Sequence, residues 1–308
     1  MINGLDRKLI ISLQKNGRAS HVDLSRELGV HVSTIAKKMQ TLEESGIIKV
    51  RALPNPAKMG YLAHAVIAIK ADINKIGSVC SHLSSNFNVN LIVTTFGRFE
   101  ILMIVYFPTW DELLNFVLSE LSTTEGILNY EIYFVKQIQK RSYLPAVDKA
   151  IPVKIDEVDR RIIEKLTEDG RYTSHHLAKE LGISLPTCTR RLAFLLKEKV
   201  IEIKAVPYLS KIETVANAFT LLRVRPNKLD EICTKLISYK SIFLMMTLFN
   251  SYDILIGLNA DSQEELHRLI NSEIFAMDGT VAYETIIRAE IIKRYYGGSL
   301  VDDSNAAS

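Results

Sequence analysis

Residues 17–48 read GRASHVDLSRELGVHVSTIAKKMQTLEESGII, and residues 170–201 read GRYTSHHLAKELGISLPTCTRRLAFLLKEKVI. Both stretches begin with Gly-Arg and share Glu-Leu-Gly, at Glu27–Gly29 and Glu180–Gly182, so the offset between them is 153 residues. The same offset places Thr94 on Thr247 and Glu131 on Glu284. One register that holds over most of a chain of 308 residues indicates two copies of one unit.

The first part of each copy is predicted to be helical. Apolar residues recur at helical spacing, and a glycine, Gly29 or Gly182, interrupts the pattern between the second and third helices. Ser20, Ser174 and Ser184 are predicted to cap helices. Two short helices joined by a tight glycine-containing turn are typical of a helix-turn-helix, although a generic three-helix bundle has the same pattern.

The second part of each copy alternates short strands with helices. In the first copy, β-branched residues indicate strands at 64–70, 90–94, 101–106 and 127–138, with helices near 76–83 and 109–121. The second copy repeats this order at 218–291. The fold class is therefore predicted as α+β, with two copies of a winged helix-turn-helix followed by a ferredoxin-like βαββαβ module.

This pattern predicts the following organisation. Residues 1–60 and 154–212 form the two winged helix-turn-helix domains, and residues 61–141 and 213–295 form the two βαββαβ domains. The segment from Lys140 to Pro152 is expected to be a linker because it contains two prolines. Residues 296–308 are expected to be a disordered tail.

The distribution of charge along the chain indicates the kind of partner that it binds. The net charge of the chain is +3, but residues 1–60 carry +5 and residues 154–207 carry +2, so the remainder is acidic. Positive charge on the helical parts favours double-stranded DNA as a partner. The chain has no apolar run long enough for a transmembrane helix and no signal sequence, so we expect no membrane association.

The cysteines and histidines point away from metal and redox chemistry. Cys80, Cys188 and Cys233 lie far apart, with no CxxC pair, and the seven histidines show no metal-ligand spacing. We therefore expect a cytoplasmic protein without a metal site or a cofactor. The sequence also lacks a phosphate-binding loop and a nucleophile motif, which predicts that it is not an enzyme.

The chain resembles the Lrp/AsnC (feast/famine) family of transcription regulators. The resemblance rests on residues 5–18, on residues 24–48, and on Val93–Leu102 around Gly97, each of which has a counterpart in the second copy. It implies a DNA-binding head followed by a ligand-sensing (RAM) module that mediates dimerisation. Members of the family usually carry one copy, so a tandem chain is expected to form an internal pseudo-dimer, with further homo-oligomer assembly through the sheets.

The resemblance assigns DNA binding to the third helix of each head. The expected contact residues in the first head are Ser33, Thr34, Ala36, Lys37, Lys38, Gln40 and Thr41. In the second head they are Ser184, Thr187, Thr189, Arg190 and Arg191. An arginine can read guanine through two hydrogen bonds, whereas a lysine more often contacts phosphate. Basic residues could also merely solvate a helix face. Lys49, Arg51 and Lys204 follow the third helices and are expected to act as wings.

The resemblance also implies an effector site, for an amino acid, at the loop between the second and third strands of each module. The corresponding residues are Thr94, Gly97, Arg98, Glu100, Thr247, Asn250, Ser251 and Asp253. Glu100 or Asp253 could bind an α-amino group or could accept backbone amides. Asn250 replaces the glycine of the first copy, and asparagine tolerates the positive φ that such a turn requires.

These observations predict a transcription regulator whose two unlike heads read an imperfect palindrome. One alternative is an enzyme similar to sirohaem decarboxylases, which are built from paired Lrp/AsnC-like halves, and another is an amino-acid-sensing or scaffold partner that does not bind DNA. Against the enzyme, the third strands contain no histidine and the heads keep their basic residues.

Overall fold

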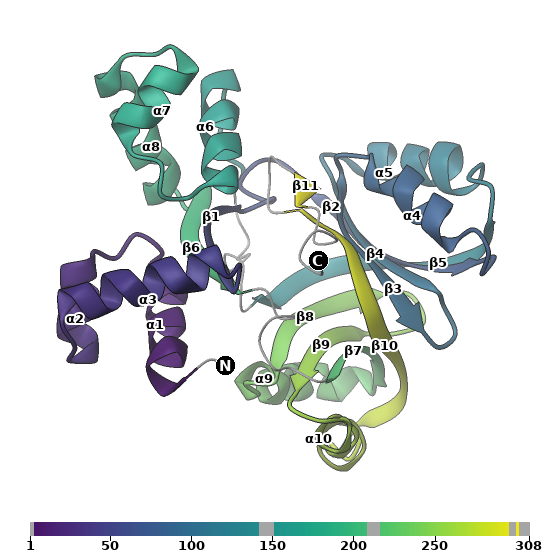
Figure 1. Ribbon diagram of the computed structural model, residues 1–308. Helices are drawn as coiled ribbons and strands as arrows, with labels where there is room; N and C mark the ends of the chain where they lie inside the picture. The colour runs from purple at the N-terminus through teal and green to yellow at the C-terminus, as the bar shows by residue number, and fades with distance from the viewer. Residues whose placement is uncertain (1–2, 142–150, 208–215, 296–299, 302–308) are drawn as a thin grey trace.

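The computed structural model describes residues 3–141, 151–207, 216–295 and 300–301. The elements of the two heads are α1 (Gly4–Lys15), α2 (His21–Leu28), α3 (Val32–Glu44) and β1 (Ile48–Pro54), then α6 (Glu157–Glu168), α7 (Ser174–Leu181), α8 (Leu185–Lys197) and β6 (Ile201–Pro207). In Figure 1 both heads lie on the same side of the βαββαβ modules.

The helix boundaries follow local capping chemistry. The side chains of Ser20 and Ser184 cap α2 and α8, as predicted. The prediction for Ser174 is wrong, because Thr173 has the extended backbone of a cap and Ser174 begins α7. Thr173 is the residue that the offset of 153 relates to Ser20. Gly29 ends α2 with a φ of 67°, a left-handed conformation that glycine adopts without strain.

Each module has the predicted βαββαβ order. The first consists of β2 (Ala63–Ala71), α4 (Ile76–Ser84), β3 (Val89–Phe96), β4 (Ile101–Phe107), α5 (Trp110–Phe116), η1 (Val117–Leu121) and β5 (Ile127–Arg141). The second consists of β7 (Ala216–Val224), η3 (Pro226–Lys228), α9 (Leu229–Ser238), β8 (Ile242–Phe249), β9 (Ile254–Ala260), α10 (Gln263–Arg268), η4 (Leu269–Ile274) and β10 (Thr280–Tyr295).

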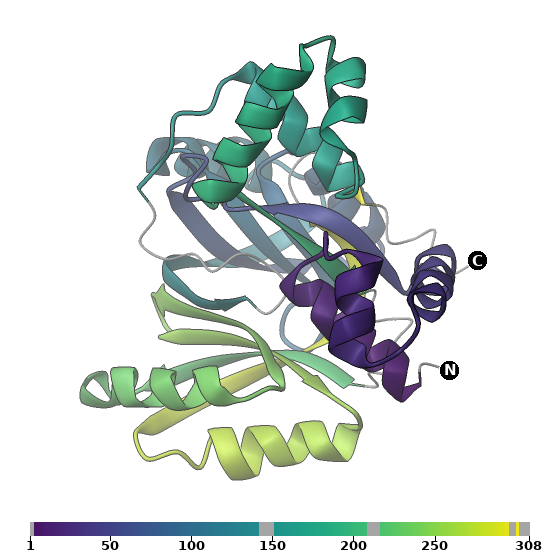
Figure 2. The ribbon, with the colours of Figure 1, turned by 90° about the vertical axis from the view of Figure 1, so that its left-hand side faces the viewer.

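The long last strand of each module joins both sheets. β5 pairs with β2 up to Phe134 and with β8 from Phe134 onward, while β10 pairs first with β7 and then with β3. The two sheets enclose one apolar core, which includes Tyr133, Phe219 and Met246, and the helices cover their outer faces (Figures 1 and 2). The expected internal pseudo-dimer is thus confirmed.

The strands that follow α3 and α8, the third helices of the two heads, do not form separate wings. β1 and β6 pair with each other in an antiparallel ribbon between the heads. Arg51 lies on this ribbon and is buried, so the expectation of a wing contact fails for Arg51. Lys204 is half-buried and forms an ion pair with Glu202, and Lys49 is exposed, so the wing contacts of these two residues stay predictions. The expectation for Arg51 failed because the pairing partner of each strand lies about 150 residues away in the chain.

The chain ends differ in part from the prediction. Lys140 and Arg141 belong to β5 rather than to a linker, and residues 142–150 lie outside the described residues. Leu300–Val301 forms a short strand, β11, against the end of β10, so the predicted disordered tail does not hold for these two residues. The rest of the predicted tail, 296–299 and 302–308, lies outside the described residues. In the described part of the chain, no helix has the length and hydropathy needed to cross a membrane.

Candidate nucleic-acid interface

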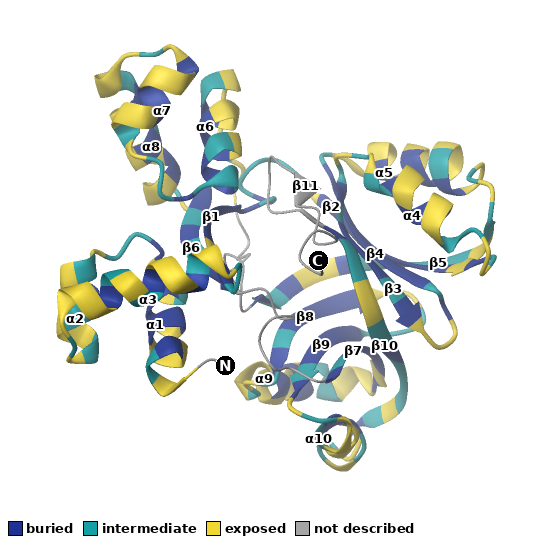
Figure 3. Cartoon of the chain, viewed as in Figure 1, coloured by how far each residue is buried: buried dark blue, intermediate teal, exposed yellow. Residues whose placement is uncertain are grey.

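The recognition helices α3 and α8 each leave one face exposed. Five of the expected contact residues in α3 are exposed, Ala36 and Lys38 are half-buried, and Ile35, Met39 and Leu42 form the buried face (Figure 3). In the second head Ser184, Thr189 and Arg190 are exposed, whereas Thr187 and Arg191 are half-buried. The structure therefore brings most of the expected residues of each head onto one exposed helix face.

The paired basic residues of each helix play two different roles. Lys37 is exposed, but Lys38 turns back to α1 and donates to Asp6 Oδ1 at 2.6 Å. In the second head Arg190 is exposed, while Arg191 pairs with Asp159 at 2.9 Å and with Asp156 at 2.6 Å. Lys38 and Arg191 thus fasten the recognition helix to the first helix of the same head.

The Asp6 carboxylate, which accepts the Lys38 ammonium, also takes part in the N-terminal cap of α1. Asp6 Oδ2 accepts the backbone N–H of Asn3 at 2.9 Å, and the Asn3 side chain accepts the Asp6 N–H at 3.0 Å. Burial raises the pKa of Asp6, but the Lys38 ammonium and the Asn3 amide outweigh it and leave the pKa below its ordinary value. Asp156 and Asp159 form the same capping box in the second head. Asp156 or Asp159 was expected near the start of this helix, but the pairing of Asp6 and Asp159 with the recognition helices was not predicted.

The two heads are docked to each other through reciprocal contacts. Gly17 N donates to Ile203 O and Gly170 N donates to Val50 O, both at 2.9 Å. A Cβ on Gly17 would lie 2.9 Å from backbone atoms of Lys204, so no larger residue fits without movement of the chain. One apolar core runs through both heads and the β1–β6 ribbon. The two recognition helices therefore belong to heads that share one packed core.

Arg18 strengthens this docking in one direction. Its guanidinium donates to Gly170 O at 2.8 Å and to Tyr172 O at 2.7 Å. Its counterpart Arg171 instead pairs with Glu43 at 3.2 Å. The shared Gly-Arg dipeptides that revealed the repeat thus take part in the contact between the heads.

The acids of the predicted effector loops bind backbone amides. Glu100 accepts Ala71 N–H at 2.8 Å and also pairs with Lys70, and Asp253 accepts Val224 N–H at 2.8 Å. Burial raises the pKa of Glu100, but Lys70 and the amide lower it further than burial raises it. Of the two roles considered for these acids, the structure shows the bond to a backbone amide.

The other loop residues lie at the ends of the sheets. Thr94 is half-buried, and Thr247 is buried and donates to Gln137 O at 3.4 Å. Gly97 and Asn250 both have a positive φ, 138° and 136°, which confirms that asparagine preserves the turn. The Asn250 side chain donates to Ile132 O at 2.8 Å, and Ser251 O accepts Arg223 Nε at 2.8 Å.

Arg98 joins carboxylates from both halves. It forms ion pairs with Glu131 on β5 and with Glu284 on β10, the latter at 3.4 Å. Tyr133 donates to Glu131 at 2.5 Å and Tyr252 donates to Glu284 at 3.1 Å. Ser251 stands where the repeat would place a second arginine, so one guanidinium serves both acids.

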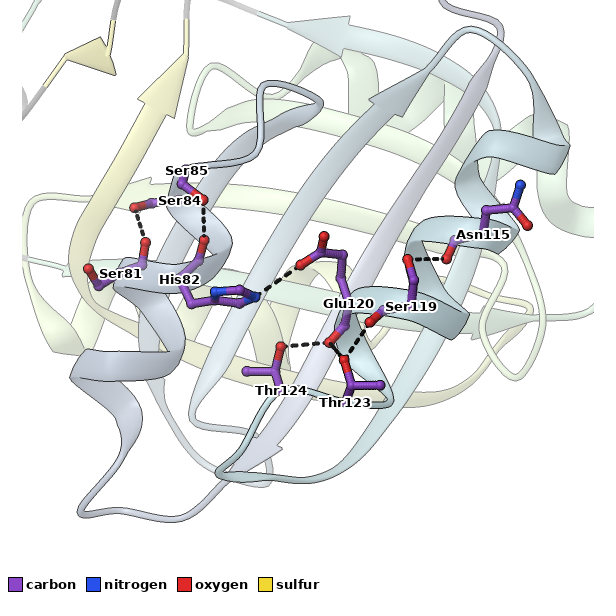
Figure 4. A network of polar contacts seen from close by, with 9 residues as sticks. All are labelled: Ser81, His82, Ser84, Ser85, Asn115, Ser119, Glu120, Thr123 and Thr124. Atoms are coloured by element: carbon purple, nitrogen blue, oxygen red, sulfur yellow. Dashed lines mark hydrogen bonds and ion pairs between the residues drawn. The ribbon is translucent and has the colours of Figure 1, made fainter.

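A separate polar network lies on the outer helices of the first module (Figure 4). His82 on α4 pairs with Glu120 on η1 at 2.9 Å, and neighbouring serine and threonine hydroxyls donate to helix carbonyls. In this network the His82–Glu120 contact joins α4 to η1, and the hydroxyl hydrogen bonds stay at the ends of each helix. Within the described ranges, no group of three or more His, Cys, Asp or Glu side chains is arranged to hold a metal ion. Cys80, Cys188 and Cys233 are buried free thiols.

Known proteins match both the heads and the half-chain unit. A family model described as winged helix-turn-helix DNA-binding matches residues 2–49 and 155–202. The HTH-type transcriptional regulator PF1231 of Pyrococcus furiosus is 34% identical over 144 residues, which are 46% of this chain and 97% of that protein. The regulator PH0140 of Pyrococcus horikoshii is 31% identical over 143 residues, covering 46% of this chain and 90% of that protein.

These findings define a helix-turn-helix DNA-binding protein of the transcription-regulator class. With its two winged heads and two βαββαβ modules, the chain belongs to the Lrp/AsnC family as a tandem member. The siroheme decarboxylase NirDL, in complex with an iron-uroporphyrin III analogue, has the same overall fold: the TM-score is 0.68 at 18% identity, and 95% of each chain is covered.

Proposed function

We propose that the chain regulates transcription by reading an imperfect palindrome with two unlike heads, and that it does so in the cytoplasm. The observation that carries the proposal is the exposed face of α3 and α8, with Lys37 and Arg190 at equivalent positions. Arg190 has the fork geometry that pairs with a guanine edge, whereas Lys37 is suited to a phosphate. Because the two heads present different side chains to DNA, we expect the two half-sites to differ in sequence.

The docking of the heads supports a fixed spacing between the half-sites. Because Gly17, Gly170 and the β1–β6 ribbon join the heads into one body, the heads cannot adjust their separation independently. Recognition helices that lie on one face of DNA require half-sites spaced by about one helical turn, or by multiples of it. We infer that insertion of half a turn between the half-sites abolishes binding by both heads.

An amino-acid effector and further homo-oligomer assembly belong to the same proposal. The turns at Gly97 and Asn250 are the proposed effector region, but Glu100 and Asp253 already hold backbone amides. An effector amine would therefore be bound by Glu284, whose Oε1 is buried without a hydrogen-bond partner among the described residues, in preference to these acids. The test is calorimetric titration with each amino acid, against the Glu284→Gln variant.

The experiment for DNA binding is selection of genomic fragments by the purified protein, followed by sequencing. Enrichment of an imperfect palindrome, with log affinity falling linearly against log salt at a slope of about 0.9 per phosphate contact, is the expected result. A half-turn insertion in the selected site serves as the control. Binding that is equal for all fragments at every salt concentration would overturn the proposal.

The fold shared with NirDL favours one second candidate, a protein that binds an iron tetrapyrrole. His64 lies in the first sheet, and burial lowers its pKa to about 4, so its imidazole is neutral at physiological pH. The test is a titration with the iron-uroporphyrin III analogue, followed by visible absorbance. A saturable shift at a ratio of one per chain would favour this candidate, and an unchanged spectrum would exclude it.

A further inference from the structure

The two heads share one exposed apolar position. Among the described residues of the heads, the large apolar side chains that are exposed are Ile11, Val22, Val32, Leu185, Phe194 and Leu196. The offset of 153 residues relates four of them to polar residues of the other head, namely Glu164, His175, Thr41 and Glu43. Val32 and Leu185 instead correspond to each other. This position therefore stays apolar and exposed in both heads, although the residue itself differs.

Val32 and Leu185 are the first residues of the recognition helices α3 and α8. Their exposed fractions are 42% and 45%. The apolar residues two places earlier, Val30 and Ile183, are half-buried against the core of the heads. The chain thus packs one apolar residue just before each helix and leaves the next one facing solvent.

Local helix chemistry does not account for an apolar residue at this position. The usual apolar contact at the start of a helix joins the residue before the N-cap to the fourth residue of the helix. In α3 these places belong to Val30 and Ile35, and Val32 lies between them. An exposed apolar side chain at the first helical position is therefore free to contact a partner.

The place of Val32 and Leu185 in the heads indicates the chemistry of that partner. The N-terminal part of a recognition helix is the part that meets base edges in the major groove. The base edges there carry hydrogen-bond donors and acceptors, and thymine alone adds a methyl group, which apolar side chains contact. Lys37 and Arg190, exposed further along the same helices, supply the positive charge that holds an anionic duplex.

The two heads differ in how apolar this first turn is. Val32 is followed by Ser33, an exposed hydroxyl that can form hydrogen bonds with DNA. Leu185 is followed by Pro186, which is also exposed and has no backbone N–H to donate. The first turn of α8 therefore offers a larger apolar surface than that of α3.

We propose that Val32 and Leu185 each contact the C5 methyl group of a thymine, so that each half-site contains one thymine that is recognised by its methyl group. This contact rests on the proposed function, because it needs both recognition helices in the major groove. It adds an apolar contact to the hydrogen bonds that Arg190 can form with a guanine edge.

The experiment measures the affinity of the full chain for its selected site after each thymine in turn is replaced by deoxyuridine. Deoxyuridine pairs as thymidine does and lacks only the methyl group. We expect one position in each half-site at which the replacement weakens binding about fourfold, the effect of removing one buried group of that size. The loss should be larger in the half-site read by the second head.

Two serine variants assign each of these thymines to a head. Val32→Ser should abolish the effect of deoxyuridine in one half-site and leave it in the other, and Leu185→Ser should do the reverse. Val22→Ser and Leu196→Ser are the matched controls, because they remove the same kinds of side chain, 47% and 37% exposed, from outside the first turn of a recognition helix. The controls should change neither effect, and all four variants should unfold at the wild-type urea concentration.

The outcomes separate the methyl contact from the proposed function. A protein that binds all DNA fragments equally would overturn both. Sequence-specific binding that tolerates deoxyuridine at every thymine would overturn the methyl contact alone. A loss of affinity with deoxyuridine that persists unchanged in both serine variants would also overturn it, since other residues would then contact the methyl groups.

Discussion

Separate substitutions of Lys37 and Lys38 test whether Lys37 contacts DNA while Lys38 holds α3 to α1. Lys37→Ala removes an exposed charge, so we expect unchanged stability and a salt slope of DNA binding that falls by about 0.9. Lys38→Ala removes the partner of Asp6, whose side chain is only 12% exposed. Loss of one partner costs about 3–5 kcal/mol in a buried ion pair and little in an exposed pair.

The Lys38–Asp6 pair is intermediate between a buried and an exposed ion pair. Lys38 retains 24% exposure, and the Asn3 amide still serves Asp6 after the substitution, so we expect a loss of about 1–2 kcal/mol in the free energy of unfolding. Urea unfolding measures it, and titration of DNA affinity against salt measures the slope. The reasoning is refuted if Lys38→Ala lowers the salt slope by a full contact and leaves unfolding unchanged.

The same pair gives a pH dependence with a defined sign. The pKa of Asp6 is lower in the folded than in the unfolded chain, so the contribution of the pair is complete above the ordinary value of 3.8 and is lost as the pH falls through the folded value. The difference in stability between wild type and Lys38→Ala should therefore shrink below about pH 4. Arg190→Ala and Arg191→Ala are the matched pair in the second head.

Three further predictions concern other contacts between the halves of the chain. Gly17→Ala should destabilise the joined heads by about 1–3 kcal/mol in urea unfolding, since its Cβ would meet backbone, whereas Gly77→Ala, with open space around it, should not. Burial lowers the pKa of Lys293 to about 8, so the folded chain binds fewer protons than the unfolded chain between about pH 8 and 10.5. The free energy of unfolding of the wild type, relative to that of Lys293→Met, should therefore rise across this pH range by at most about 3 kcal/mol. Urea unfolding at each pH measures this difference. Arg98→Ser takes the residue of the second copy and leaves two carboxylates close together, so its melting temperature should fall, and added salt should restore part of the loss.

The sequence predicted the larger features because they repeat. The offset of 153 residues showed the tandem unit, the order of elements and the face of each recognition helix, and applied to Ser20 it would have identified Thr173 as a cap. The split roles of Lys37 and Lys38 were not predictable from spacing alone. Adjacent residues on a helix point about 100° apart, and only the position of Asp6 on α1 decides which one is bound.

The pairing of strands that lie far apart in the chain could also not be predicted from the sequence. Nothing local in β1 distinguishes a wing from a strand that pairs with β6. No turn residue marks Phe134, the residue at which β5 changes its partner from β2 to β8. The alternation of Tyr133 and Val135 toward one core shows that both parts of the strand bury the same face. A strand that serves two sheets has the same pattern as a long strand in one.

Fusion of the two copies explains why they differ where they do. In a dimer of identical chains, any substitution occurs twice, and an arginine at the position of Arg98 would meet its own counterpart beside the same two acids. Here one guanidinium bridges Glu131 and Glu284 from both halves, and Ser251 takes the second place. A dimer of identical chains would place two arginines beside these two acids, whereas the fused chain can carry one arginine that contacts both. The same freedom permits Lys37 in one head and Arg190 in the other.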